Sequence, residues 1–191
     1  MACKLNVVGS GSGDSKTLFR NFFSRGKPSC PTAFGNGSGR LGTILVADRD
    51  KDDVWLLSYA LKGAGIKNPV RWLSDIDEVI QFLGHGVRRS AKFTSIPEMP
   101  LLLFVEWNIP WSGAVDLLKW IRQEPRFLAL LIVVITKSDD PEQKRLAYEA
   151  GADWHFVKSK DFSDLMRLVH RLREFWSCAV EAGFHEQPAE R

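Results

Sequence analysis

The stretch LLLFVEWNIP, residues 101–110, begins with five consecutive apolar residues and becomes polar at Glu106. A short, uninterrupted apolar run predicts a strand that is covered on both faces, as the strands of parallel sheets are. Two similar runs lie on either side of it along the chain, TILVA at 43–47 and LLIVVI at 130–135. The three runs together predict the centre of a parallel sheet.

Segments with a helical spacing of apolar residues alternate with these strands. Two more strands are predicted over 70–73 and 154–157, and helices over 53–64, 75–83, 114–123, 141–150 and after Asp161. Asp140 before Pro141 is a typical helix start, and Gly151 a typical stop. In the second helix we expect Ile76, Val79, Ile80 and Leu83 to face inward. Five strands alternating with five helices predict a doubly wound (βα)5 α/β domain.

The first 42 residues differ in composition from the rest of the chain. They contain six basic residues, one acidic residue and eight of the fifteen glycines. We predict a disordered, basic, Gly/Ser-rich leader over 1–41, with a short helix at 17–24. One domain is expected over 42–178, followed by a polar tail over 179–191. Without the leader the chain is nearly neutral, which argues against a nucleic-acid partner.

Composition narrows the class of protein further. The chain has 191 residues, of which 45% are hydrophobic and 26% charged, as in an ordinary globular protein. No apolar stretch approaches the roughly 18 residues of a membrane span, so no membrane contact is expected. Three cysteines without a CxxC spacing favour a reducing, cytoplasmic location over a disulfide or zinc scaffold.

Polar residues follow the predicted strands at the edge where parallel strands end together. They are Asp48, Arg49 and Asp50 after the first strand, Glu106 after the third, Thr136 after the fourth and Lys158 after the fifth. Carboxylates can hold a divalent cation or accept a phosphoryl group, and a hydroxyl and an ammonium neutralise phosphoryl oxygens. This constellation is typical of phosphoryl handling.

These motifs resemble the receiver domain of bacterial two-component response regulators. The resemblance covers about residues 41–176 and rests on the acidic turn, EWNIP, ITKS and FVK, in chain order. The stretch ADRDKDDVWLLSYALKGAGI is similar to single-domain receivers associated with phytochrome-type kinases. The resemblance implies a flavodoxin-like sheet in the order 2-1-3-4-5. It also implies a role in phosphorelay signal transduction, as a signalling protein and not an enzyme.

The resemblance also assigns roles to the residues at the strand ends. Asp48 and Asp50 belong to the acidic pocket, and Arg49 stands where the family has an aspartate that binds the metal. Glu106 stands at the phosphoacceptor aspartate. Thr136 and Lys158 match the phosphate-contacting hydroxyl and lysine. The remaining departures from the family pattern are His155 at the switch position, Lys137 in place of a small residue and Ser159 in place of a proline.

The departures predict a degenerate pocket. Glu106 is one methylene longer than aspartate, which displaces an attacking oxygen by ~1 Å and costs roughly 100-fold in rate. Arg49 offers no oxygen ligand, so we expect Mg²⁺ binding to be lost or weak, with no catalytic residue, bound metal or other cofactor. We further expect Arg49 and Lys158 to pair with Glu106 and Thr136 to donate to it.

Three hypotheses follow for the function. The first is a pseudo-receiver that signals through protein contact without phosphorylation. The second is an ordinary receiver that accepts a phosphoryl group from a histidine kinase. The third is a structural docking domain in which the pocket residues are remnants. The expected partner is a protein, such as a histidine kinase, or a second copy bound through the face that carries Trp154 and His155.

Overall fold

The computed structural model describes residues 42–85, 100–109 and 113–183. The predicted leader with its helix at 17–24, and residues 184–191 of the predicted tail, lie outside these ranges. The strands are β1 (Ile44–Ala47), β2 (Val70–Leu73), β3 (Leu102–Glu106), β4 (Leu131–Thr136) and β5 (Trp154–Val157). The helices are α2 (Lys51–Gly63), α3 (Ile76–His85), α4 (Gly113–Gln123), α5 (Pro141–Ala150) and α6 (Phe162–Gly183), with a 3-10 turn at Pro125–Phe127.

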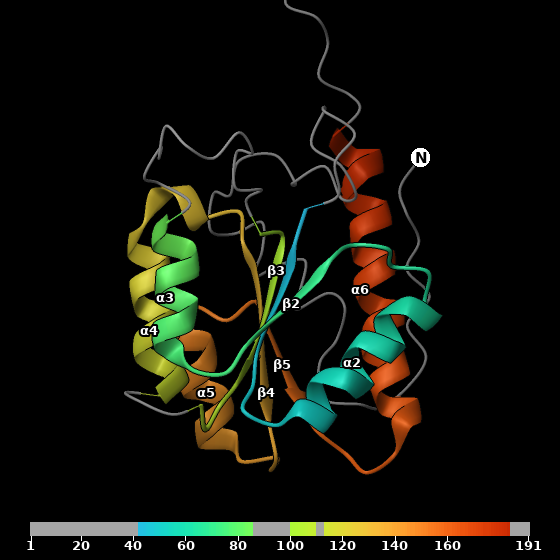
Figure 1. Ribbon diagram of the computed structural model, residues 1–191, viewed down its shortest axis with the longest axis horizontal. Helices are drawn as coiled ribbons and strands as arrows, with labels where there is room; N and C mark the ends of the chain where they lie inside the picture. The colour runs from blue at the N-terminus through green and yellow to red at the C-terminus, as the bar shows by residue number, and fades with distance from the viewer. Residues whose placement is uncertain (1–41, 86–99, 110–112, 184–191) are drawn as a thin grey trace, which may run out of the picture.

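The strands form one parallel sheet in the order β2-β1-β3-β4-β5, which confirms the predicted fold class. Helices α2 and α6 cover one face, and α3, α4 and α5 cover the other (Figure 1). Every residue of β1, β3 and β4 is buried, as the apolar runs predict. None of the described helices is long and apolar enough to cross a membrane.

The register brings the carboxyl ends of the strands together. Ala47 pairs with Val105, Glu106 with Ile135 and Thr136 with Val157. Strands β3 and β4 each extend one residue beyond the predicted end, so Glu106 and Thr136 are strand residues and not loop residues. The backbone of both residues is therefore fixed by pairing within the sheet, which sets the positions from which their side chains extend.

Several predicted helix details need correction. The first helix begins at Lys51 and not at residue 53, because the Asp50 carboxylate caps it by accepting from the Asp52 amide at 3.0 Å. The inward position predicted for Ile80 is wrong, since 37% of that residue is exposed while Val79 is buried. The last helix continues to Gly183, beyond the predicted domain end at residue 178.

A buried ion pair ties the opposite edge of the sheet together. The Arg122 guanidinium lies 2.7 Å from the carboxylate of the fully buried Asp153, which also accepts from the Ile132 amide at 2.8 Å. Arg122 donates as well to the carbonyl oxygens of Gly151 and Leu130, at 2.9 and 3.0 Å. These contacts join α4 to the starts of β4 and β5, so they hold the sheet from the edge that lies away from the polar strand ends.

Candidate functional site

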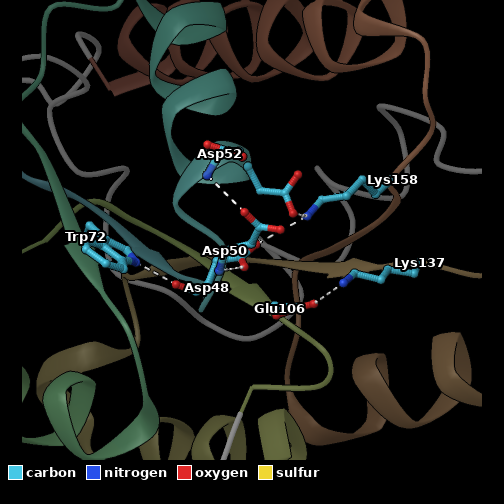
Figure 2. A network of polar contacts seen from close by, with 8 residues as sticks. Asp48, Asp50, Asp52, Trp72, Glu106, Lys137 and Lys158 are labelled. Carbon is cyan, nitrogen blue, oxygen red and sulfur yellow. Dashed lines mark hydrogen bonds and ion pairs between the residues drawn. The ribbon is translucent and has the colours of Figure 1, made fainter.

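Asp48 lies directly after β1 and is held by contacts to both its carboxylate and its backbone carbonyl. Only 3% of the residue is exposed. Its Oδ1 accepts from the Asp50 amide at 2.9 Å, and its backbone carbonyl accepts from the Trp72 indole at 2.6 Å (Figure 2). Burial raises the pKa of Asp48, and the hydrogen bond from Asp50 and the charge of Lys158 offset this only in part.

Lys158 follows β5 and reaches back toward the first helix. Its ammonium forms ion pairs with Asp53 of α2 and with Asp48, the latter at 3.4 Å (Figure 2). Burial lowers the pKa of Lys158, but the hydrogen bond to Asp53 and the charges of the two carboxylates outweigh burial and raise it. The lysine is therefore a firmly charged group that is shared by two carboxylates.

Glu106, the last residue of β3, is 2% exposed. The Lys137 ammonium lies 3.3 Å from its Oε1, as Figure 2 shows, and approaches from a side chain that is 53% exposed. Neither carboxylate oxygen accepts a geometrically acceptable hydrogen bond within the described part of the chain. A buried carboxylate thus depends on one solvent-facing lysine for its counter-charge.

Thr136 and His155 form a separate buried pair beside this carboxylate. The Thr136 hydroxyl oxygen lies 2.9 Å from His155 Nε2 and 2.9 Å from the Ser138 carbonyl oxygen. Burial lowers the pKa of His155; the charge of Lys144 lowers it further, and the charge of Asp139 opposes them. The imidazole is therefore neutral near pH 7.

The expected pairing around Glu106 is wrong in three respects. Arg49 is exposed and has no ion pair with a described residue, so it does not pair with Glu106. Lys158 pairs with Asp48 and Asp53 instead. The Thr136 hydroxyl is taken up by Ser138 and His155, so the carboxylate lacks that donor as well.

The residues named for the predicted self-association face are buried, while self-association itself stays a prediction. Trp154 is 4% exposed and His155 is 1% exposed, because both side chains lie in the layers beneath the helices. Val169 and Leu172 of the last helix are likewise buried in the core. None of these four side chains is available to a partner in this structure.

Two residues complete the site: Asp53, which was not predicted for it, and Lys137, which was noted as a departure from the family pattern but not as the partner of Glu106. Asp53 carries one of the two contacts to Lys158, and its signal was the acid run DRDKDD, in which Asp53 stands three residues after the helix cap. Lys137 supplies the counter-charge of Glu106, and its signal was its place directly after Thr136. No group of three or more His, Cys, Asp or Glu side chains in the described ranges is arranged to hold a metal ion.

Fold and site together define a class. A parallel sheet in the order 2-1-3-4-5 brings an acidic turn, a carboxylate, a hydroxyl and a lysine to one edge. Residues 42–183 thereby have the fold of response regulator receiver domains and are similar to them in sequence. No family model matches the chain.

Comparison with known proteins finds response regulators among those similar to this chain. The chain is 26% identical over 133 residues to response regulator Rcp1 of Synechocystis sp., covering 70% of this chain and 87% of Rcp1. It is 24% identical over 135 residues to the probable methanogenesis regulatory protein FilR2 of Methanothrix harundinacea, covering 70% and 82%. The crystal structure of response regulator RPA3017, in red light signaling of R. palustris, superposes with a TM-score of 0.62 at 24% identity, covering 71% and 94%. That structure supports the fold.

Proposed function

We propose that this protein is a degenerate receiver that signals through protein contact from a fixed state, independently of phosphorylation. One observation carries the proposal: each buried carboxylate of the pocket already faces a lysine ammonium. Asp48 faces Lys158, and Glu106 faces Lys137. In this arrangement the cations that a phosphorylated receiver would gather around its phosphoryl group are supplied by the chain itself.

The acceptor position supports the same proposal. Phosphoryl transfer depends on in-line placement of the attacking oxygen and on donors that neutralise the developing charge. Glu106 carries its oxygens one methylene further from the strand than an aspartate would. The Thr136 hydroxyl, which matches the phosphate-contacting hydroxyl of the family, contacts His155 and Ser138 instead of Glu106. Both differences disfavour transfer to this carboxylate.

The metal that a receiver uses does not fit these residues. Mg²⁺ requires near-octahedral oxygen ligands. Here Asp48 and Asp53 share the Lys158 ammonium, and the second acidic position is occupied by Arg49. We therefore propose that Mg²⁺ binds weakly or not at all and that the protein works without a cofactor.

A protein is the proposed partner, with a histidine kinase as the first candidate because the chain is similar to response regulators. The nearly neutral net charge of the chain after residue 42 does not favour a nucleic-acid partner. We propose a cytoplasmic location, where such kinases present their signalling domains.

Phosphorylation with a small phosphodonor and Mg²⁺, followed by intact-mass measurement, tests the proposal. Wild type is expected to gain no phosphoryl group. Glu106→Asp alone is expected to remain inert, because position 49 still provides no carboxylate. Glu106→Asp combined with Arg49→Asp is expected to gain Mg²⁺-dependent phosphorylation. Glu149→Asp, the same shortening at an exposed helix position, is the matched control and stays unmodified.

The two other hypotheses predict different results. Stoichiometric, hydroxylamine-labile phosphorylation of wild type would establish an ordinary receiver and overturn the proposal. A purely structural docking domain predicts that Lys137→Ala and Lys158→Ala leave the partner captured by wild type in a pull-down unchanged. The fixed-state proposal predicts weaker capture by at least one of these folded variants.

A further inference from the structure

Helix α2 presents a row of aromatic side chains to solvent. Trp55 is 65% exposed and Tyr59 is 58% exposed, and their rings stack at a centroid distance of 5.6 Å and an interplanar angle of 16°. Phe162, at the start of α6, extends the row, with its ring 5.9 Å from that of Tyr59. Contiguous exposed aromatics of this size mark interaction surfaces, because Trp and Tyr gain much from burial at an interface.

Acidic side chains border this row at the start of the helix. Asp50 and Asp52 are exposed at the N-terminal turn of α2, and neither forms an ion pair with a described residue (Figure 2). Asp53 lies beside them and is neutralised by Lys158. The surface therefore combines stacked aromatic rings with two exposed carboxylates, although the exposed Lys51 stands between those carboxylates in the sequence. Rings and these exposed carboxylates together favour a cationic, apolar ligand.

The chain contains a segment of that composition outside the described ranges. Residues 16–27, KTLFRNFFSRGK, contain four cations and no acidic residue. Its four large apolar residues recur at spacings of one, three and four, which places them on one face of a helix. They are Leu18, Phe19, Phe22 and Phe23.

We propose that residues 16–27 dock in cis on the aromatic face of α2, with the phenylalanines against Trp55 and Tyr59 and the cations toward Asp50 and Asp52. Fourteen residues, 28–41, connect this segment to the described domain. At ~3.3–3.6 Å per residue they reach up to about 50 Å. Helix α2, with its 13 residues, is only ~20 Å long. A connection of this length keeps the segment at an effective concentration of about the millimolar range, so even a weak contact is populated.

Hydroxyl-radical footprinting of the full-length protein, with mass spectrometry, tests the docking. The double variant Phe19→Ser, Phe22→Ser changes residues outside the described ranges and none of the buried residues described for the core. The proposal expects at least a threefold faster labelling of Trp55 and Tyr59 in this variant than in wild type. Ile80, exposed on α3 across the sheet, is the internal control and keeps its rate. Unchanged labelling of Trp55 and Tyr59 overturns the proposal.

Cross-linking distinguishes docking in cis from other occupants. In a full-length chain with Cys3, Cys30 and Cys178 replaced by Ser, Ser24→Cys is combined with Lys62→Cys on α2 or, as the matched control, with Asp77→Cys on α3. The proposal expects a monomeric disulfide to form at least tenfold faster at position 62 than at 77, with the advantage reduced by 0.5 M NaCl. Equal rates at the two positions overturn the proposal. Dimeric products alone also overturn it, since they assign the face to a second copy.

Discussion

The Thr136 hydroxyl and the His155 imidazole face each other at 2.9 Å inside the protein, where the residues are 2% and 1% exposed. The hydroxyl has one proton and donates it to the Ser138 carbonyl, so the imidazole donates from Nε2. His155 Nδ1 then accepts no hydrogen bond within the described part of the chain. The hydrogen bond between Thr136 and His155 ties the end of β4 to β5, and the neutral imidazole donates it from Nε2.

The first prediction concerns pH. Because burial lowers the pKa of His155 in the folded state, protons bind more readily to the unfolded chain. The contribution of the neutral His155 to the free energy of unfolding is complete above the pKa of about 6.5 that histidine has in the unfolded chain. It is lost as the pH falls below that value, by at most ~1.4 kcal/mol per pH unit. Urea denaturation at pH 7.5 and 5.5 should show wild type losing more stability than His155→Gln, which keeps a donor but does not titrate.

Other groups also titrate between pH 5.5 and 7.5, so the effect of His155 is the difference between wild type and His155→Gln. The raised pKa of Asp48 favours the folded state at lower pH, and this acts equally on both proteins. Parallel stability curves for the two proteins would contradict a buried, neutral His155.

The second prediction concerns Lys158. Replacing it with Ala leaves Asp48 and Asp53 close together without their shared cation. We expect the free energy of unfolding to fall by about 1–3 kcal/mol, since a partly buried charge pair loses one member. Lys160→Ala, at an exposed position two residues away, should change stability little. Equal effects of the two substitutions would contradict the ion pairs assigned to Lys158.

The third prediction tests the dependence of Glu106 on Lys137. Lys137→Ala should lower the free energy of unfolding by about 1–2 kcal/mol, because the buried carboxylate loses its counter-charge. In a Glu106→Gln background the same substitution should cost much less. A double-mutant cycle by chemical denaturation measures this coupling. Additive effects would show that the two side chains do not interact.

The fourth prediction compares two arginines whose ion pairs have similar distances. Arg122→Ala should lower the free energy of unfolding by about 3–5 kcal/mol, because the buried Asp153 loses the ion pair with Arg122. Arg145→Ala, on the exposed surface of α5, should have no measurable effect on the melting temperature. Thermal unfolding of both variants checks this, and a comparable loss in both would mean that burial does not set the strength of these pairs.

Sequence patterns predicted the fold well because its three central strands, β1, β3 and β4, are buried on both faces. The continuous apolar runs of β3 and β4 identify these strands without any need to decide which alternate residues face the core. The N-cap Asp140 and the C-cap Gly151 set the two ends of α5 through local backbone contacts. Ile80 was misplaced because the apolar stripe of α3 is wider than its contact with the sheet. Local spacing cannot show how much of a stripe the neighbouring elements cover.

The candidate site was predicted in position but not in its pairing. Parallel topology brings all strand ends to one edge, so Asp48, Glu106, Thr136 and Lys158 could be grouped from sequence. Which lysine meets which carboxylate depends on side-chain direction. The exposure of Arg49, and the approach of Lys137 to Glu106, follow from the turn geometry after β1 and β4, which the pattern of residue types does not encode.

The left-handed Gly151 has a consequence for how this chain can change over time. Its φ of +118° disfavours any side chain, and a Cβ there would lie 2.5 Å from Arg122 Cγ. Replacing Arg122 first would relieve that crowding but would leave Asp153 without its counter-ion. A substitution at either residue 122 or residue 151 alone is therefore expected to be destabilising. Across descendants of this sequence, residues 122, 151 and 153 should be inherited as a block, whereas exposed positions such as Arg145 vary freely.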